Sequence, residues 1–333
     1  MRREPLGLTV GITTRNRPDS LRRCLASLIV LGDLVSEVIV IDDASDEPPV
    51  EALKALPAAL ASRLTFVRQP GGRGPIVGRN AIVRRAGTPF VLLLDDDTVL
   101  LDPAPLLEAI GILAHHPEVA AVACAQAEAD GSPWPAGAQP SAVDYPCFVP
   151  AFTGFAHIVC RAAFLEIGGY RESFVFYGEE KELCLRWLDA GRMVLYLPHA
   201  RVVHAPDPSG RSASRYLRQV IRNDCLGAMY NEPLPLPLIT VPVRLYRYFV
   251  MRRHGHVRDS GGFGWIVGEL MRSLPDVARS RRPVRWQTLR LWRSLRASPA
   301  RFEPRAAGRP VGPGAAPAGG PAGAADLARA DLE

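Results

Sequence analysis

Apolar segments that end in polar or acidic residues recur through the first hundred residues of the chain. The three clearest lead into a turn, a pair of aspartates and a run of three aspartates: residues 8–13, 37–41 and 89–94. Stretches with helical spacing separate them, and this alternation is typical of a mostly parallel, Rossmann-like α/β sheet with helices on both faces. Open sheets of this kind bind ligands at the carboxyl ends of their strands, so we predict the functional site at that edge.

The connecting elements follow from local patterns. We expect a first helix capped by Asp19 or Ser20 and a second helix over residues 50–60. A glycine-rich loop at 71–78 then precedes a helix at 80–85.

The pattern changes in the second part of the chain. Residues 130–150 are rich in Pro, Gly and Ala, which predicts an irregular connection. Residues 179–189 predict a helix with Leu183 and Trp187 on its inner face, and a strand at 193–197 follows.

Composition supports a large globular protein and excludes several classes. With 333 residues, 47% of them hydrophobic, the chain can bury a large core. It opens without a signal-peptide pattern, and its longest late apolar run, 234–243, is too short and too rich in proline to cross a membrane. Six cysteines without CxxC spacing or histidine partners favour buried thiols over a zinc site or disulfides. We therefore expect a cytoplasmic protein.

Positive charge is concentrated towards the C-terminus, although the net charge is only +6. Residues 244–305 hold 15 arginines against four acidic residues, and aromatic residues lie between the arginines. Two interpretations stay open: peripheral contact with the anionic inner face of the cell membrane, or helices that pack on the rest of the protein. Nucleic acid is not an expected partner, because the acidic N-terminal site does not suit it.

Asp95, Asp96 and Asp97 follow the most apolar of the expected strands. Three adjacent carboxylates repel one another, so this cluster favours a divalent cation, although an acidic turn before a helix is the alternative. A cation shared with a diphosphate would offset the charge on a departing nucleoside diphosphate.

Two further features fit a nucleotide site but are weaker. Asp42 and Asp43 end a strand, where acidic side chains can hydrogen-bond a base or ribose, although such pairs are also common in turns. The loop at 71–78, followed by Arg79, can approach a phosphate closely, but it matches neither GxGxxG nor the P-loop.

Together these segments resemble the GT-A fold glycosyltransferases of family 2, which are inverting and nucleotide-sugar dependent. The resemblance covers about residues 6–207 and rests on Thr13-Thr14-Arg15-Asn16-Arg17, Ile41-Asp42-Asp43-Ala44-Ser45, Gly72 to Asn80, and Asp95-Asp96-Asp97. The loop departs from the family pattern at Gly72 and Gly78, where the family has Asn and Ala.

The resemblance implies roles for individual residues on the donor side. Those that would bind the nucleotide sugar are Thr13, Arg15, Asp43, Arg79, Asp95 and Asp96. A divalent metal cofactor, Mn2+ or Mg2+, would be held by Asp97 and Asp95 with His204.

On the acceptor side, the resemblance implies a catalytic base and its surroundings. Gly154 and Glu179 would lie on that side, and Glu180 would be the base, where the family usually has aspartate.

The resemblance also divides the chain. A catalytic domain at 1–207 would comprise a nucleotide-sugar half at 1–100 and an acceptor half at 101–207. A helical, arginine-rich extension at 208–304 would follow, and the Ala, Gly and Pro tail at 305–333 would be disordered.

The expected function is transfer of a sugar from a UDP- or dTDP-sugar to a hydroxyl acceptor, lipid-linked acceptors included. Synthesis of a cell-surface polysaccharide, a glycolipid or a glycosylated metabolite would use such a reaction. Two alternatives stay open: a nucleotidyltransferase, which would release pyrophosphate from a nucleoside triphosphate, and a catalytically inactive glycosyltransferase-like scaffold.

Overall fold

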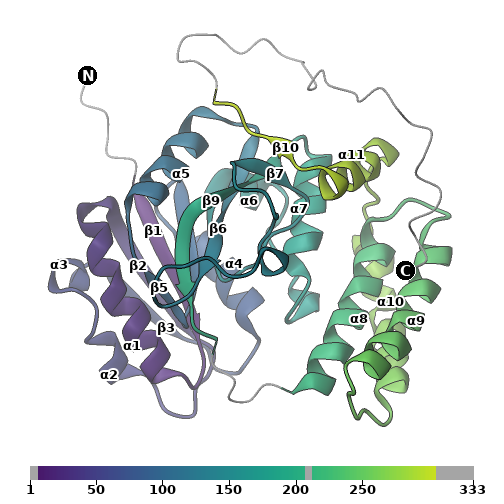
Figure 1. The fold of residues 1–333 in the computed structure, drawn as a ribbon. Coiled ribbons are helices and arrows are strands. Elements are labelled where there is room, and N and C mark those ends of the chain that lie inside the picture. The colour runs from purple at the N-terminus through teal and green to yellow at the C-terminus, as the bar shows by residue number, and fades with distance from the viewer. Residues whose placement is uncertain (1–6, 207–211, 305–333) are drawn as a thin grey trace. The chain divides into compact units, whose positions relative to one another are not determined.

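The computed structural model of the protein describes residues 7–206 and 212–304. The predicted disordered tail at 305–333 and the predicted boundary at residue 207 lie outside these residues. Up to Phe302 the chain forms one compact unit around a ten-stranded sheet, with helices packed against both faces (Figure 1).

The sheet is mixed and mostly parallel in its N-terminal half. Its strands are β1 (Leu8–Thr14), β2 (Val35–Asp42), β3 (Leu64–Arg68), β4 (Phe90–Asp95), β5 (Thr98–Leu100), β6 (Val119–Ala127), β7 (Cys147–Val149), β8 (Ala156–Cys160), β9 (Met193–His204) and β10 (Ala300–Arg301). The main order is β10-β7-β9-β6-β8-β4-β1-β2-β3, and β5 pairs with β9. Strands β4, β1, β2 and β3 are parallel, whereas β8 runs antiparallel to both of its neighbours.

The carboxyl ends of the central strands form the edge at which the sequence predicts the functional site. β1 is buried along its whole length, and its residue Thr13 pairs with Ile41 of β2 and with Asp95 of β4. The polar residues that follow these strands therefore emerge side by side, as the sequence predicts.

Alternation along the strands divides the core into two layers. In β4, Val91 and Leu93 face one cluster, whereas Leu92 and Leu94 face the other. The helices before residue 190 are α1 (Pro18–Ser27), α2 (Val50–Leu53), α3 (Ala58–Ala61), α4 (Pro75–Arg85), α5 (Ala104–His115), α6 (Arg161–Glu166) and α7 (Glu179–Asp189). Short 3-10 turns are η1 (Leu28–Leu34), η2 (Ala136–Ala138) and η3 (Glu172–Phe174). Helices α4, α6 and α7 pack on the core layer that contains Val91 and Leu93, and helices α1 and α5 pack on the layer that contains Leu92 and Leu94.

Two predicted helix boundaries are wrong for reasons that involve proline. Helix α1 is preceded by Arg17, with no side-chain cap, and starts on Pro18, whose fixed φ suits a first helical position. The helix expected at 50–60 is two short helices with Pro57 as the cap of the second.

Two further boundaries differ from prediction. Helix α4 begins at Pro75 and so includes Gly78, because Gly74 with φ of 89° turns the chain before it. Strand β9 continues beyond residue 197 to His204, and its register with β6 shifts between Ala123 and Ala125. The helix at 179–189 has its predicted bounds, and Leu183 and Trp187 are fully buried.

Among the described residues, the helices between β9 and β10 are α8 (Ala213–Asn231), α9 (Pro237–His254), α10 (Gly262–Ser280) and α11 (Trp286–Ala297). Helix α8 packs on α7, α9 and α10, and its buried residues Ile221 and Leu226 belong to the same core layer as α7. Within the described ranges, no helix is both long and apolar enough to span a membrane. The six cysteines are free thiols, and five of them are buried.

Candidate functional site

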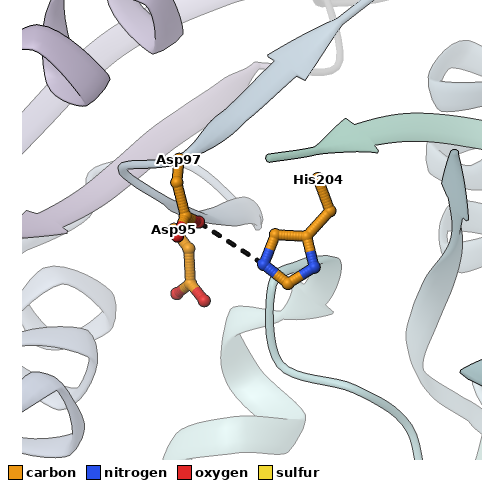
Figure 2. A group of neighbouring side chains, drawn as sticks. All are labelled: Asp95, Asp97 and His204. Carbon is orange, nitrogen blue, oxygen red and sulfur yellow. Dashed lines mark ion pairs between the residues drawn. The ribbon is translucent and has the colours of Figure 1, made fainter. Parts of the chain in front are cut away.

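Asp95, Asp97 and His204 converge at the carboxyl edge of the sheet (Figure 2). Asp95 ends β4 and Asp97 follows it in the turn to β5, while His204 ends β9 and pairs with Thr98 of β5. One ligand atom from each of the three side chains lies within 4.8 Å of the others, and His204 Nε2 is 3.5 Å from Asp97 Oδ1. Two segments separated by over 100 residues thus meet at one point.

The imidazole of His204 is held in one orientation. Its Nδ1 is 2.7 Å from the side-chain oxygen of Gln126, whose amide nitrogen donates to the Ala138 carbonyl oxygen. The ring is stacked on Phe155 and on Trp134, with centroid distances of 5.0 and 5.5 Å. With Nδ1–H donating to Gln126, the Nε2 lone pair faces Asp97, which is how metal-binding histidines are commonly oriented.

The chemistry of these three side chains fits a divalent cation. Carboxylate oxygens are the ligands that Mg2+ and Mn2+ prefer, and a neutral imidazole is a common metal ligand in proteins. Asp97 is almost fully buried and Asp95 is partly exposed, so the group faces solvent on one side only. The residues therefore fit the metal that the sequence predicts.

Asp96 points away from this group. Its carboxylate accepts a hydrogen bond of 2.7 Å from Thr14 Oγ1 and lies 3.3 Å from Arg17, which also lies 3.3 Å from Asp97. Burial, with a further contribution from the adjacent carboxylates, raises the pKa of Asp96 to about 7.

Asp43 holds the glycine-rich loop. Its two carboxylate oxygens accept hydrogen bonds from the backbone N–H groups of Arg73 and Gly74, at 2.7 and 2.9 Å. Arg15 is half exposed and lies 3.9 Å from Asp43. Thr13 packs so closely on the helix start that a Cβ at Gly78 would lie 2.5 Å from its methyl group, which explains the glycine there.

Arg79 links the metal group to the acceptor side. Its buried guanidinium pairs with Asp95 at 2.6 Å and Glu179 at 3.0 Å, donates to the Gly154 carbonyl oxygen, and lies 3.9 Å from Glu180. Burial alone would lower the pKa of Arg79, but the attraction of Asp95 and Glu179 outweighs it and raises that pKa.

Glu179 and Glu180 form the first turn of α7. Burial raises the pKa of both carboxyls, and repulsion from Glu179 adds to the effect on Glu180, whose pKa rises to about 8. A Cβ at Gly154 would lie 2.2 Å from Glu180 Oε1. A side chain at position 154 would therefore displace this carboxylate from its present place.

The structure thus brings the predicted site residues to one edge and adds others. Gln126 and Arg17 contact His204 and Asp97 respectively, yet neither was among the predicted site residues. Arg17 lies within the quoted first-strand motif, so that motif could have indicated it. Gln126 sits in an apolar strand, and nothing in its sequence surroundings indicates a role.

Comparison with known proteins gives matches to the N-terminal part of the chain. Residues 9–156 match the family described as Glycosyl transferase family 2. A Pre-mycofactocin glycosyltransferase of Mycobacterium tuberculosis is 32% identical over 212 residues, which cover 59% of this chain and 42% of that protein. The succinoglycan biosynthesis protein ExoU of Rhizobium meliloti is 30% identical over 93 residues, or 28% of this chain and 27% of that protein. The chain thus spans less than half the length of these relatives.

A solved structure extends the likeness over most of the fold. The mannosyltransferase of Pyrobaculum calidifontis in complex with GDP-Man and Mn2+ aligns with a TM-score of 0.53 over 89% of this chain and 81% of that one. At 17% identity the likeness concerns the fold alone.

Proposed function

Because residues 9–156 match glycosyl transferase family 2 and the chain has the GT-A fold, we propose that it transfers a sugar from a nucleoside-diphosphate donor to a hydroxyl acceptor. The observation that carries this proposal is the convergence of Asp95, Asp97 and His204 beside the buried pair of Arg79 and Glu179. This arrangement places a group that can bind a metal next to the Glu180 carboxylate of α7, which can act as a base.

The donor binds across the carboxyl edge in this proposal. The nucleoside lies near Thr13, Arg15 and Asp43, and the diphosphate near Asp95 and Asp97. Support comes from the glycine-rich loop, which Asp43 holds in place through two N–H groups. Asp95, Asp97 and His204 would hold a Mn2+ or Mg2+ ion, which would supply positive charge to stabilise a departing diphosphate.

Glu180 acts as the base. It removes the proton of the acceptor hydroxyl while that oxygen attacks the anomeric carbon and the bond to the diphosphate breaks, so that the configuration inverts in one step. The raised pKa of Glu180 supports the assignment, because a carboxylate whose pKa lies near the working pH is a stronger base towards an alcohol than an ordinary carboxylate and is still partly ionised there.

Turnover of defined donors tests the proposal. We expect the protein with Mn2+ to release a nucleoside diphosphate from one of UDP-glucose, dTDP-glucose and GDP-mannose, and the freed sugar to have the inverted anomeric configuration by NMR. Retention of configuration would contradict the role of Glu180. Release of pyrophosphate from a nucleoside triphosphate would instead indicate a nucleotidyltransferase, and donor binding without turnover a scaffold.

We also propose peripheral contact with an anionic membrane, such as the inner face of the cell membrane, through α9. Its side chains Ile239, Val243 and Tyr246 are each more than half exposed and recur at helical spacing. The helix contains no acidic residue and has Arg252, Arg253 and His254 in its last turn. An apolar stripe flanked by arginines suits an anionic lipid surface.

Vesicle sedimentation tests this contact. The protein is expected to pellet with phosphatidylglycerol vesicles at low salt and not with phosphatidylcholine vesicles, and Ile239→Glu to weaken pelleting. Leu107→Glu, at an apolar position on α5 that is also more than half exposed, is the matched control. Wild-type protein that stays in the supernatant with both lipids would contradict the membrane contact.

A further inference from the structure

The loop between η3 and α7 has an unusual backbone. Val175 has φ of 63° and ψ of −54°, and Tyr177 and Gly178 also have positive φ, at 70° and 81°. The N–H of Phe176 donates to the carbonyl oxygen of Phe174 at 2.6 Å, so Val175 is the centre of a γ-turn. A β-branched residue rarely adopts this conformation, so contacts from outside the loop must hold it there.

A single buried amide on α8 provides these contacts. The side-chain nitrogen of Asn223 lies 2.9 Å from the carbonyl oxygen of Phe174 and 2.7 Å from those of Phe176 and Tyr177. Asn223 is only 1% exposed. The three carbonyls flank the strained residue, so this amide, with two N–H groups shared among them, holds the loop on both sides of Val175.

Arg222 fixes the orientation of the Asn223 amide. Arg222 Nη1 donates to Asn223 Oδ1 at 2.7 Å and to the carbonyl oxygen of Ser173 at 2.8 Å. Arg222 is itself buried and lies 3.7 Å from Glu269 of α10. The oxygen of Asn223 therefore faces the guanidinium, and its N–H groups face the loop.

The loop joins the two halves of the candidate site. Gly178, in the left-handed conformation, directly precedes Glu179 and Glu180 at the start of α7. At the other end, a Cβ at Gly74 would lie 2.7 Å from the carbonyl oxygen of Val175, and Gly74 is the residue whose N–H binds Asp43. A shift of the loop would therefore move Glu180 relative to the donor loop.

We propose that Asn223 is a positioning residue for the transfer reaction, which makes α8 a functional part of the catalytic unit. It holds the loop 174–178 and so sets the distance between the proposed base and the donor. This inference rests on the proposed function. It concerns a residue outside the region that matches the family.

The test compares Asn223→Asp with wild type. Aspartate keeps the shape and still accepts from Arg222, but it cannot donate to the loop carbonyls. We expect turnover of the active donor to water, in the absence of any acceptor, to fall about 100-fold, because a small misplacement of a catalytic group has effects of this size. UDP or GDP affinity with Mn2+, measured by calorimetry, is expected to stay unchanged, and backbone amides 174–180 to exchange hydrogen faster.

Cys225→Ala, on the same helix and with no hydrogen bond to the loop, is the control for general loosening of α8. If Asn223→Asp does not fold, Asn223→Ser, which cannot reach all three carbonyls, is measured with the same expected loss. Wild-type turnover and wild-type amide exchange in these variants would overturn the inference, as would an equal loss in Cys225→Ala. Failure of the wild type to bind any nucleoside diphosphate would instead contradict the proposed function.

Discussion

The donor edge of the sheet and the segment around α7 are built in different ways. At the donor edge, Asp43 and Asp95 to Asp97 are placed by three adjacent parallel strands whose ends lie side by side. Around α7, Glu180 is placed by a strained loop that depends on Asn223, more than 40 residues later in the chain. The strands that place these aspartates lie within the first hundred residues, whereas the second region needs a distant helix. We therefore expect substitutions in the two regions to have separable effects on donor binding and on turnover.

The largest expected effect concerns the second region. Glu180→Gln removes the proposed base but keeps the size of the side chain, so kcat is expected to fall by about 100- to 10,000-fold. Binding of UDP or GDP is expected to stay unchanged by calorimetry. Parallel loss of nucleotide affinity would show that Glu180 belongs to the donor region and would remove the distinction.

A smaller effect is expected from a residue that supports the first region. Gln126→Leu removes the acceptor of the His204 Nδ1–H, and loss of such a partner typically weakens metal binding by about 10- to 100-fold. Titration of Mn2+ into the protein in the presence of the nucleoside diphosphate measures the change. Gln219→Leu, a partly buried glutamine on α8, is the control. Unchanged Mn2+ affinity in Gln126→Leu would indicate that His204 does not bind the metal.

The pH dependence of turnover also distinguishes the donor edge from the segment around α7. The pKa of Glu180 is raised to about 8, and only its ionised form can accept a proton. Turnover should therefore rise with pH and level off above about 8, falling about tenfold for each unit below. Nucleotide binding should not follow this profile. A turnover profile that is flat from pH 6 to 9 would contradict the assignment.

The smallest expected effect is on stability. Glu180 has a folded-state pKa above its ordinary value, so the folded state binds a proton that the unfolded chain releases, and stability falls as pH rises between the two values. Glu180→Gln should remove this cost and raise Tm by about 1–3 °C at pH 8. Scanning calorimetry at pH 5 and pH 8 measures it. A decrease in Tm at pH 8 would mean that the charged form is stabilised in the folded protein.

The same contrast explains what could be predicted from sequence. The strands before Asp43 and Asp95 are short, apolar and close together in the chain, so their order and their common edge follow from local patterns. Helix α7 was also predictable, because its buried face repeats at helical spacing. Local patterns failed where proline decides a boundary, as at Pro57 and Pro75.

The residues that the sequence did not indicate depend on contacts between distant segments. Asn223 lies in an amphipathic helix whose pattern indicates packing only, and its role appears when α8 lies against the loop at Phe176. Gln126 is similar, since its partner His204 is 78 residues away. The spacing of these residues in the sequence does not indicate that they are in contact in the fold.

The most direct test of the central claim is calorimetric titration of UDP, dTDP and GDP into the protein, with and without Mn2+, in the wild type, Asp97→Ala and Glu180→Gln. The account predicts that one nucleoside diphosphate binds the wild type and Glu180→Gln equally, only with Mn2+, and does not bind Asp97→Ala. Metal-independent binding that survives in Asp97→Ala, or no binding to the wild type, would contradict it.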